Sequence, residues 1–230
     1  MNDRSYRIPL LGKALDLLSV GGSIIPLAPH LPSTAKQRLL DAALLEFARA
    51  GFDGASIRTI MKLLGMRESG FYAHFPSKQK AYDALFEEGS PALVTRWVSH
   101  IAADQPPDAA LRKLAGEIME AWLAPRARLL SSVVLRELFS GRSEKRQELL
   151  TAMHEAQQTL GRLLAAWQQR GAIRDQTDPT SLAFEFLSPL IMLRSLHFNH
   201  ASTIEELREG DIRIARHVET FLQMVLVTPQ

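Results

Sequence analysis

The side chains best suited to specific chemistry stand close together in the first third of the chain. Arg67 and Glu68 are followed by Ser69 and Gly70, which makes a short polar run between two apolar ones. A guanidinium can donate to both O6 and N7 of guanine, and a carboxylate can accept from N4 of cytosine. One chemistry open to this run is the recognition of base edges in DNA.

Two short helices are expected to position this run. Ser56 can cap the first helix, because its hydroxyl can accept from a free backbone N–H, and apolar residues then recur at helical spacing as far as Leu64. Gly65 stands where that helix must end and turn. A second short helix fits Glu68 to Phe75. Two helices joined in this way form a helix-turn-helix, whose second helix enters the major groove of DNA.

A longer pattern surrounds the turn between these helices. Gly65-Met66 is followed by Phe71-Tyr72-x-His74-Phe75, and Lys78 comes three residues later. This combination resembles the signature of the TetR family of bacterial transcriptional regulators. The resemblance covers about residues 34 to 88. Over the rest of the chain, only the size and the helical character agree with that family.

The resemblance implies roles for individual polar residues. Tyr72, His74 and Lys78 match positions that in the family meet the phosphate backbone, where hydroxyl, imidazole and ammonium groups donate to anionic oxygens. Ser56 and Thr59 also suit phosphate contact, near the free N–H groups of a helix start. Each assignment has an alternative: core packing for Tyr72, an inter-helix hydrogen bond for His74, and a merely solvated ammonium for Lys78.

The expected reading helix departs from the family pattern. Arg67 stands where a hydroxyl residue usually caps the helix, and Gly70 stands where threonine or alanine is common. Glycine in a first turn weakens a helix by up to about 1 kcal/mol and offers no side chain to a base. Met61 and Leu64 replace residues that are usually alanines, which predicts wider packing of the two helices. The operator sequence therefore does not follow from the family.

The remainder of the chain predicts helices throughout, because its apolar residues keep the helical period without strand-like alternation. Capping residues, prolines and glycines mark the expected ends. We also expect Asp108 to cap a helix, and Gly210-Asp211 to divide the last helical stretch into a turn and a helix. The expected helices span residues 34–51, 77–89, 90–101, 108–122, 126–140, 143–170 and 178–199, with the final one near 211–227.

The fold class that follows is all-α, with an N-terminal three-helix helix-turn-helix domain and a C-terminal helical domain for regulation and dimerisation. The predicted division is residues 1–32 as a flexible extension, 33–80 as the DNA-binding domain, and 81–230 as the second domain. Charge agrees with it: residues 33–80 carry eight basic and four acidic side chains, whereas residues 81–230 carry 16 and 19. A basic module on a mildly acidic body suits a phosphate partner at one end.

Composition narrows the possible classes of protein. The chain has 230 residues, 46% hydrophobic and 23% charged, which is ordinary for a globular protein. No apolar run is long enough for a membrane helix, and the absence of cysteine excludes disulfides and thiolate metal sites. These features fit a cytoplasmic protein. The segment before residue 33, where a signal peptide is conceivable, is interpreted as a flexible arm or alternatively as a basic arm that touches DNA.

An enzyme or metal protein is the less favoured interpretation. The sequence has no Gly-x-Ser-x-Gly, no His-Glu-x-x-His and no glycine-rich phosphate loop, so we expect no catalytic residues and no cofactor. His197 and His200, together with His154 or Glu185, form a weak candidate metal site, because neighbouring carboxylates are lacking. Ordinary surface or interface histidines are the favoured reading, and we expect no metal.

Large apolar side chains in the second domain allow two interpretations, a completely packed core or a cavity for a small molecule. The resemblance favours the cavity, since family members usually sense small molecules there. The candidate ligand-binding residues are Met119, Trp122, Phe139, Met153, Trp167 and Phe186.

The predicted function is a homodimeric, ligand-responsive repressor that binds double-stranded operator DNA and is released by a small apolar effector. No membrane partner is expected. Alternatives are a DNA-binding adaptor or architectural protein without a ligand, and a helical enzyme that uses the same fold. An activator in place of a repressor also remains open.

Overall fold

The structure, a computed structural model, describes residues 34–89, 92–139, 144–174 and 177–227. Within these ranges every element is a helix, and the one pairing of extended backbone is an isolated bridge between Ile173 and Leu226. The prediction of an all-α fold is therefore confirmed. The expected helix start at Ser90 and Pro91 and the whole of segment 1–32 lie outside the described residues.

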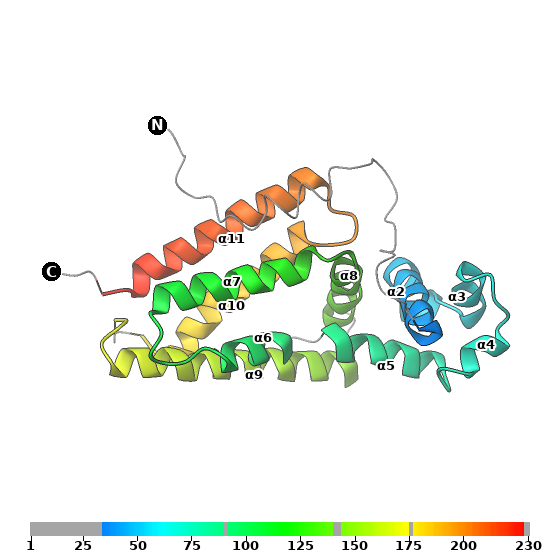
Figure 1. Cartoon of the computed structure of the whole chain (residues 1–230), viewed down its shortest axis with the longest axis horizontal. Helices are drawn as coiled ribbons and strands as arrows, with labels where there is room; N and C mark the ends of the chain where they lie inside the picture. The colour runs from blue at the N-terminus through cyan, green and yellow to red at the C-terminus, as the bar shows by residue number, and fades with distance from the viewer. Residues whose placement is uncertain (1–33, 90–91, 140–143, 175–176, 228–230) are drawn as a thin grey trace.

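Four helices form the amino-terminal end of the molecule, which we call the head: α2 (Ala35–Gly54), α3 (Ile57–Leu63), α4 (Ser69–Tyr72) and α5 (Lys78–Gly89) (Figure 1). Thr34 caps α2, since its hydroxyl accepts from the N–H of Gln37 at 3.2 Å. Gly51 interrupts α2 with a φ of 73°, which a glycine adopts without steric cost, and so the regular helix ends at the predicted residue.

The expected helix from Glu68 to Phe75 is shorter than predicted. It has four residues, Ser69–Tyr72, and no side chain caps its start at Glu68. A glycine in its first turn adds to this weakness, because glycine loses the most backbone entropy on becoming helical. Phe71 and Phe75 are nevertheless both buried, as their spacing predicts, so packing fixes this segment.

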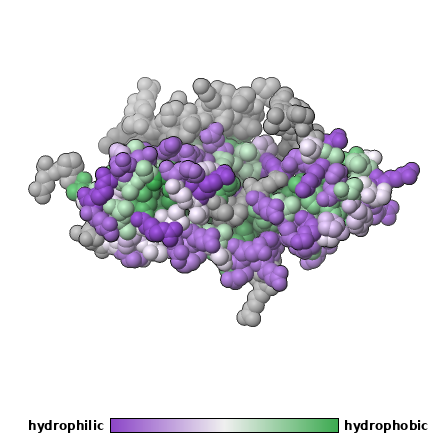
Figure 2. Space-filling view, turned by 60° about the horizontal axis from the view of Figure 1, so that its bottom comes forward, coloured by the Kyte–Doolittle hydropathy of each residue, from purple (hydrophilic) through white to green (hydrophobic). Residues whose placement is uncertain are grey.

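Six further helices form the body: α6 (Ala92–Ser99), α7 (Pro107–Leu123), α8 (Pro125–Phe139), α9 (Glu144–Gln169), α10 (Pro179–His197) and α11 (Ile204–Val225). The long α9 runs along one side beneath α6, while α8 stands between the other body helices and α2 of the head (Figure 1). Figure 2 views the molecule from the side of α9, where hydrophilic residues cover most of the surface and hydrophobic strips lie between them.

Most predicted helix ends in the body agree with the structure. Asp178 caps α10 by accepting from Ser181 N–H at 2.8 Å, and Thr203 caps α11 by accepting from Glu206 N–H at 3.2 Å. The expectation that Asp108 caps a helix is wrong. The helix begins one residue earlier, at Pro107, and the Asp108 carboxylate instead receives Arg112 Nη1 at 2.8 Å within the first turns.

The predicted break at Gly210-Asp211 is also wrong, because α11 continues from Ile204 to Val225 without interruption. A Cβ at position 210 would lie 2.6 Å from both His197 Cβ and a ring atom of Phe198, at the end of α10. Gly210 therefore serves close approach between two helices. The tertiary contact outweighs the low helix propensity of glycine.

Two apolar clusters hold the molecule together. One joins α7, α9, α10 and α11, with Trp167, Phe186 and Phe221 among its fully buried members. The other fills the head and extends into the body, because Leu129 and Val133 of α8 pack into it. The predicted division at residues 80 and 81 remains a prediction, while packing ties α8 to the head.

Candidate functional site

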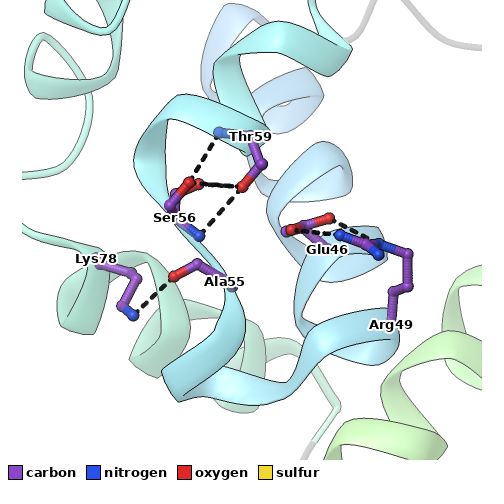
Figure 3. Close-up of polar contacts among 6 residues, drawn as sticks. All are labelled: Glu46, Arg49, Ala55, Ser56, Thr59 and Lys78. Atoms are coloured by element: carbon purple, nitrogen blue, oxygen red, sulfur yellow. Dashed lines mark hydrogen bonds and ion pairs between the residues drawn. The ribbon is translucent and has the colours of Figure 1, made fainter.

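The start of α3 is fixed by a reciprocal pair of hydroxyl groups (Figure 3). Ser56 Oγ accepts from Thr59 N–H at 3.1 Å, and Thr59 Oγ1 accepts from Ser56 N–H at 3.1 Å. The two hydroxyl oxygens are 2.8 Å apart. The cap predicted at Ser56 is thus present. Since Ser56 is exposed and Thr59 half-buried, the two hydroxyls stabilise the helix start and still border the surface.

The base-reading residues predicted in and before α4 lie at the surface. Arg67, Glu68 and Ser69 are exposed, and Gly70 is half-buried. A Cβ at Gly70 would lie 3.2 Å from the terminal methyl groups of Met61 and Met66. The small residue in α4 therefore faces the large, fully buried Met61 of α3. These two departures from the family pattern compensate for each other.

Tyr72 and His74 differ in how far they extend from the head. Tyr72 is 58% exposed, with its ring edge-to-face against the buried Phe71 at a centroid distance of 5.7 Å. His74 is half-buried. Among the described residues no group hydrogen-bonds to the His74 ring, so the alternative of an inter-helix hydrogen bond gains no support. The exposed Tyr72 hydroxyl suits an external acceptor.

Lys78 is bound within the head. Its Nζ donates to the carbonyl oxygens of Phe52 at 2.7 Å and Ala55 at 2.9 Å, and it lies 4.3 Å from the centroid of the Phe52 ring. Figure 3 shows the contact with Ala55. An ammonium has three N–H groups, so these two bonds leave one for an outside acceptor. The structure gives Lys78 a fold-stabilising contact that its sequence position does not predict.

A buried carboxylate supports the same end of the molecule. Glu46 of α2 is 3% exposed and receives Arg49 through bonds of 3.0 and 3.1 Å. The hydrogen bond from Arg49 is the main reason that the pKa of Glu46 is lowered, because it favours the ionised carboxylate. The ion pair lies beside the start of α3 (Figure 3).

The body contains a cavity of about 490 Å³, a volume within the range of small-molecule sites. Residues of α6, α7, α8, α9 and α10 line it, and most are apolar. Two of the six predicted ligand-binding residues, Trp122 and Met153, belong to this lining. Seven polar side chains stand among the apolar ones: Arg126, Ser131, His154, Gln157, Ser188, Arg194 and Ser195.

The other four predicted ligand-binding residues do not line the cavity. Met119, Trp167 and Phe186 are buried in the core, at 1%, 0% and 0% exposure. Phe139, which we selected as a large apolar residue, is 85% exposed because it lies in the last turn of α8, beyond the packed part of that helix. Large size predicts burial but does not tell which side of a helix faces a void.

Arg194 and Ser131 are lining residues that the sequence analysis missed. Arg194 Nε and Ser131 Oγ are fully enclosed, and neither has a hydrogen-bond partner among the described residues. Burial lowers the pKa of Arg194 to about 10, so the side chain is still a cation near neutral pH. An arginine in the last turn of a helix is ordinary in a sequence, and only the fold reveals that it faces a cavity.

The weak metal candidate receives no support from the geometry. His200 Nδ1 lies 2.7 Å from Ser132 Oγ, and His154 Nε2 lies 2.8 Å from Gln158 Nε2. In the part of the chain that the structure describes, no three His, Cys, Asp or Glu side chains converge as metal ligands would. None of the described helices is both long and apolar enough to span a bilayer.

These features define the class of protein: an all-α protein with a helix-turn-helix head. Residues 39–87 match the model of the family described as "Bacterial regulatory proteins, tetR family". The chain is also 27% identical over 158 residues to the HTH-type transcriptional regulator RutR of Escherichia coli K12, covering 66% of this chain and 70% of RutR. The head of the chain therefore matches the tetR family of bacterial regulatory proteins, and two thirds of the chain is similar to a helix-turn-helix transcriptional regulator.

Solved structures agree at the level of the fold. SmeT in complex with triclosan has a TM-score of 0.63 and 17% identity, over 84% of this chain and 91% of that one. SmeT is the repressor of the multidrug efflux pump SmeDEF of Stenotrophomonas maltophilia. AibR in complex with isovaleryl coenzyme A and operator DNA has a TM-score of 0.58 and 21% identity, over 79% and 96% of the two chains.

Proposed function

We propose that this regulator is a homodimeric repressor that leaves its operator when a small, mainly apolar molecule enters the cavity of the body. The observation that carries this proposal is the position of α8. Leu130 and Val134 of this helix line the cavity, and both also belong to the apolar cluster of the head. A molecule that reshapes the cavity wall therefore acts on the packing of the DNA-binding head.

Polar contacts strengthen this connection between α8 and the head. Arg126 pairs with Asp41 of α2, and Arg136 Nη2 donates to the carbonyl oxygen of Ala48 at 3.2 Å. Tyr82 of α5 donates to a carboxylate oxygen of Glu137 at 3.0 Å. A rigid helix with bonds on several sides transmits a shift better than a loop would. The ligand can change DNA affinity by no more than its own preference between the two conformations.

In this proposal Arg67, Glu68 and Ser69 read bases, while Gly70 lets α4 lie close to α3. Tyr72, His74 and the remaining N–H of Lys78 donate to phosphates, as do Ser56 and Thr59 at the start of α3. Two heads would occupy successive major grooves of a near-palindromic operator. A dimer gains affinity because, once one head is bound, the second contact becomes intramolecular.

Dimerisation is supported by apolar side chains on the outer faces of α10 and α11. Met192 and Leu196 of α10 are 60% and 58% exposed, and Ile212 and Met224 of α11 are 51% and 54% exposed. Large apolar groups gathered on neighbouring helices are typical of an interface between subunits. Two such helices from each subunit would form a four-helix contact, and the protein would act in the cytoplasm.

The test begins with selection of bound sequences from a random duplex library, followed by fluorescence anisotropy with the selected duplex. We expect at least a hundredfold preference over a scrambled duplex of equal length. Tyr72→Phe should weaken binding to both duplexes to a similar extent, because it removes a phosphate donor and keeps the ring. Equal affinity for all sequences, or an unchanged affinity in Tyr72→Ala, would contradict the DNA-binding assignment.

The second candidate function is a DNA-binding adaptor with no ligand. A cavity of about 490 Å³ argues against it, since a body with a purely structural role gains nothing from an unfilled apolar volume. Filling the cavity with Ala127→Phe tests the point. We expect that variant to bind the operator and to lose its response to any effector.

A further inference from the structure

Two enclosed polar atoms in the cavity lining have no described partner, Arg194 Nε of α10 and Ser131 Oγ of α8. Buried polar atoms are nearly always hydrogen-bonded, and each unsatisfied one costs roughly 1 to 3 kcal/mol. A guanidinium whose Nε is enclosed and which has no carboxylate partner is more costly still. Two such atoms in the lining of one cavity indicate that the cavity is built for an oxygen-bearing group.

The charge of the lining is positive near neutral pH. It contains Arg126 and Arg194, and no aspartate or glutamate belongs to it. Arg126 is already paired with Asp41 of α2. Arg194 has no ion pair with any described residue; its guanidinium instead lies 5.3 Å from the centroid of the Trp122 ring. Arg194 is therefore the cation that remains to be neutralised.

We infer that the molecule bound in this cavity is an amphipathic monocarboxylate, whose anionic group is held by Arg194 and Ser131 and whose apolar body fills the rest. The guanidinium and the hydroxyl can both donate to a carboxylate, and charge-assisted bonds of this kind are short and strong. The remaining lining suits a hydrocarbon chain or ring, since Val94, Ile118 and Leu187 are among its members.

This inference rests on the proposed function and narrows it from an apolar molecule to an apolar acid. It also gives the ligand a way to act on the head. A carboxylate held by both residues would join α10 to α8, and α8 packs into the apolar cluster of the head. A neutral molecule of the same shape would fill the cavity without making that connection.

Isothermal titration calorimetry with three probes of equal chain length tests the inference: decanoate, decanol and decylamine. We expect decanoate to bind at least tenfold more tightly than decanol, and decylamine to bind least well. Arg194→Met, which keeps an apolar stem, should reduce the affinity for decanoate to that for decanol and leave decanol unchanged. Arg194→Lys should restore part of the preference, and Ser131→Ala should weaken decanoate binding severalfold.

Controls distinguish loss of the anchor from loss of the fold. Arg194→Met should melt at the same or a higher temperature without ligand, because it removes an unpaired enclosed charge. Arg162→Met, on the exposed side of α9, should alter neither binding nor melting. Anisotropy with the selected operator duplex should show release by decanoate, with a much weaker effect of decanol.

The outcomes separate this inference from the proposed function. If decanol binds and releases DNA as well as decanoate does, or if Arg194→Met keeps the preference for decanoate, the acid-binding inference is overturned and the apolar cavity of the proposed function stands. If none of the three probes binds and none affects DNA affinity, the cavity itself is not an effector site, and both proposals fail together.

Discussion

The ammonium group of Lys78 lies 2.9 Å from the carbonyl oxygen of Ala55, where the end of α2 leads into α3. Ala55 is the first residue beyond α2, so its carbonyl receives no bond from the regular helix pattern. Lys78 begins α5. The contact therefore ties the start of α5 to the junction between α2 and α3.

We expect Lys78→Met to destabilise the protein by about 1–3 kcal/mol, because two carbonyl groups lose a charged donor. Urea denaturation measures this loss. Lys80→Met is the control, since Lys80 is exposed and lies 3.9 Å from Asp83. If Lys78 also contacts a phosphate, its replacement should reduce the salt dependence of DNA binding by about one unit of slope. An unchanged midpoint in urea would refute the structural role.

The capping pair Ser56 and Thr59 should affect DNA binding through the stability of α3. Ser56→Ala should cost about 1 kcal/mol, measured by urea denaturation. Thr203→Ala removes the equivalent cap of α11 and serves as the matched control. Both variants should lose similar stability, yet operator affinity should fall markedly in Ser56→Ala alone. Equal loss of DNA affinity in both would show that the α3 hydroxyls have no local role.

Gly210→Ala should be strongly destabilising, by about 2 kcal/mol or more. The added Cβ would stand 2.6 Å from His197 Cβ and from the Phe198 ring, so α10 and α11 would have to separate. Arg208→Ala, at an exposed position of the same helix, should leave the melting temperature within about a degree. A Gly210→Ala variant that is more stable than the parent would show that helix propensity governs this position.

Asp211 should make stability depend on pH. Burial raises its pKa from 3.8 to about 6, so the folded state holds this proton more tightly than the unfolded state does. The contribution of Asp211 to the free energy of unfolding is fully present below the ordinary pKa of 3.8. It is lost as the pH rises through the raised pKa. Because the carboxyl is partly solvated, we expect Asp211→Asn to gain only about 1 kcal/mol at pH 7.5.

Denaturation curves of both proteins at fixed concentration between pH 4 and pH 8 check the Asp211 prediction. The difference in the free energy of unfolding between Asp211→Asn and the parent protein should be close to zero at pH 4. It should grow up to about pH 7. A difference that is constant across the range would mean that the gain has another source.

The exposed apolar residues of α10 and α11 should control the oligomeric state. Leu196→Glu and Ile212→Glu each place a carboxylate on the proposed subunit contact. Burying an unpaired carboxylate there costs free energy, because it loses its hydration. We expect both to shift the protein toward monomers in sedimentation velocity runs and to lower operator affinity. Leu45→Glu introduces the same change on α2, where the parent residue is 40% exposed, and should leave the sedimentation unchanged. A dimer that persists in both α10 and α11 variants would place the contact elsewhere.

Helix ends were predictable wherever a local bond defines them. Thr34, Ser56, Asp178 and Thr203 each accept from a backbone N–H three residues later, an interaction within one turn of chain. Gly210 was misread because its role depends on the end of α10, which the sequence does not place beside it. The sequence alone does not distinguish a glycine that ends a helix from one that allows a second helix to pack closely.

The candidate site was predictable to different depths in the two parts of the molecule. In the head, the sequence pattern around Tyr72 predicts two short helices joined by a turn. The hydrogen bonds of Lys78 to main-chain carbonyls do not follow from that pattern. In the body, size alone selected Phe139 and Trp167, of which one is exposed and the other packed in the core. Arg194 was overlooked because an unpaired charge becomes visible only when its surroundings are known.

Helix α8 both lines the cavity and packs into the apolar cluster of the head, which restricts how its residues can change during evolution. Substitutions of Leu130 or Val134 that reshape the cavity also disturb the apolar cluster under the DNA-binding helices. Lining residues on α6 and α9, such as Val94 and Met153, do not belong to the apolar cluster of the head. Under the proposed function, adaptation to a new effector is expected to begin on those two helices, where the cavity can change without disturbing the packing of the head.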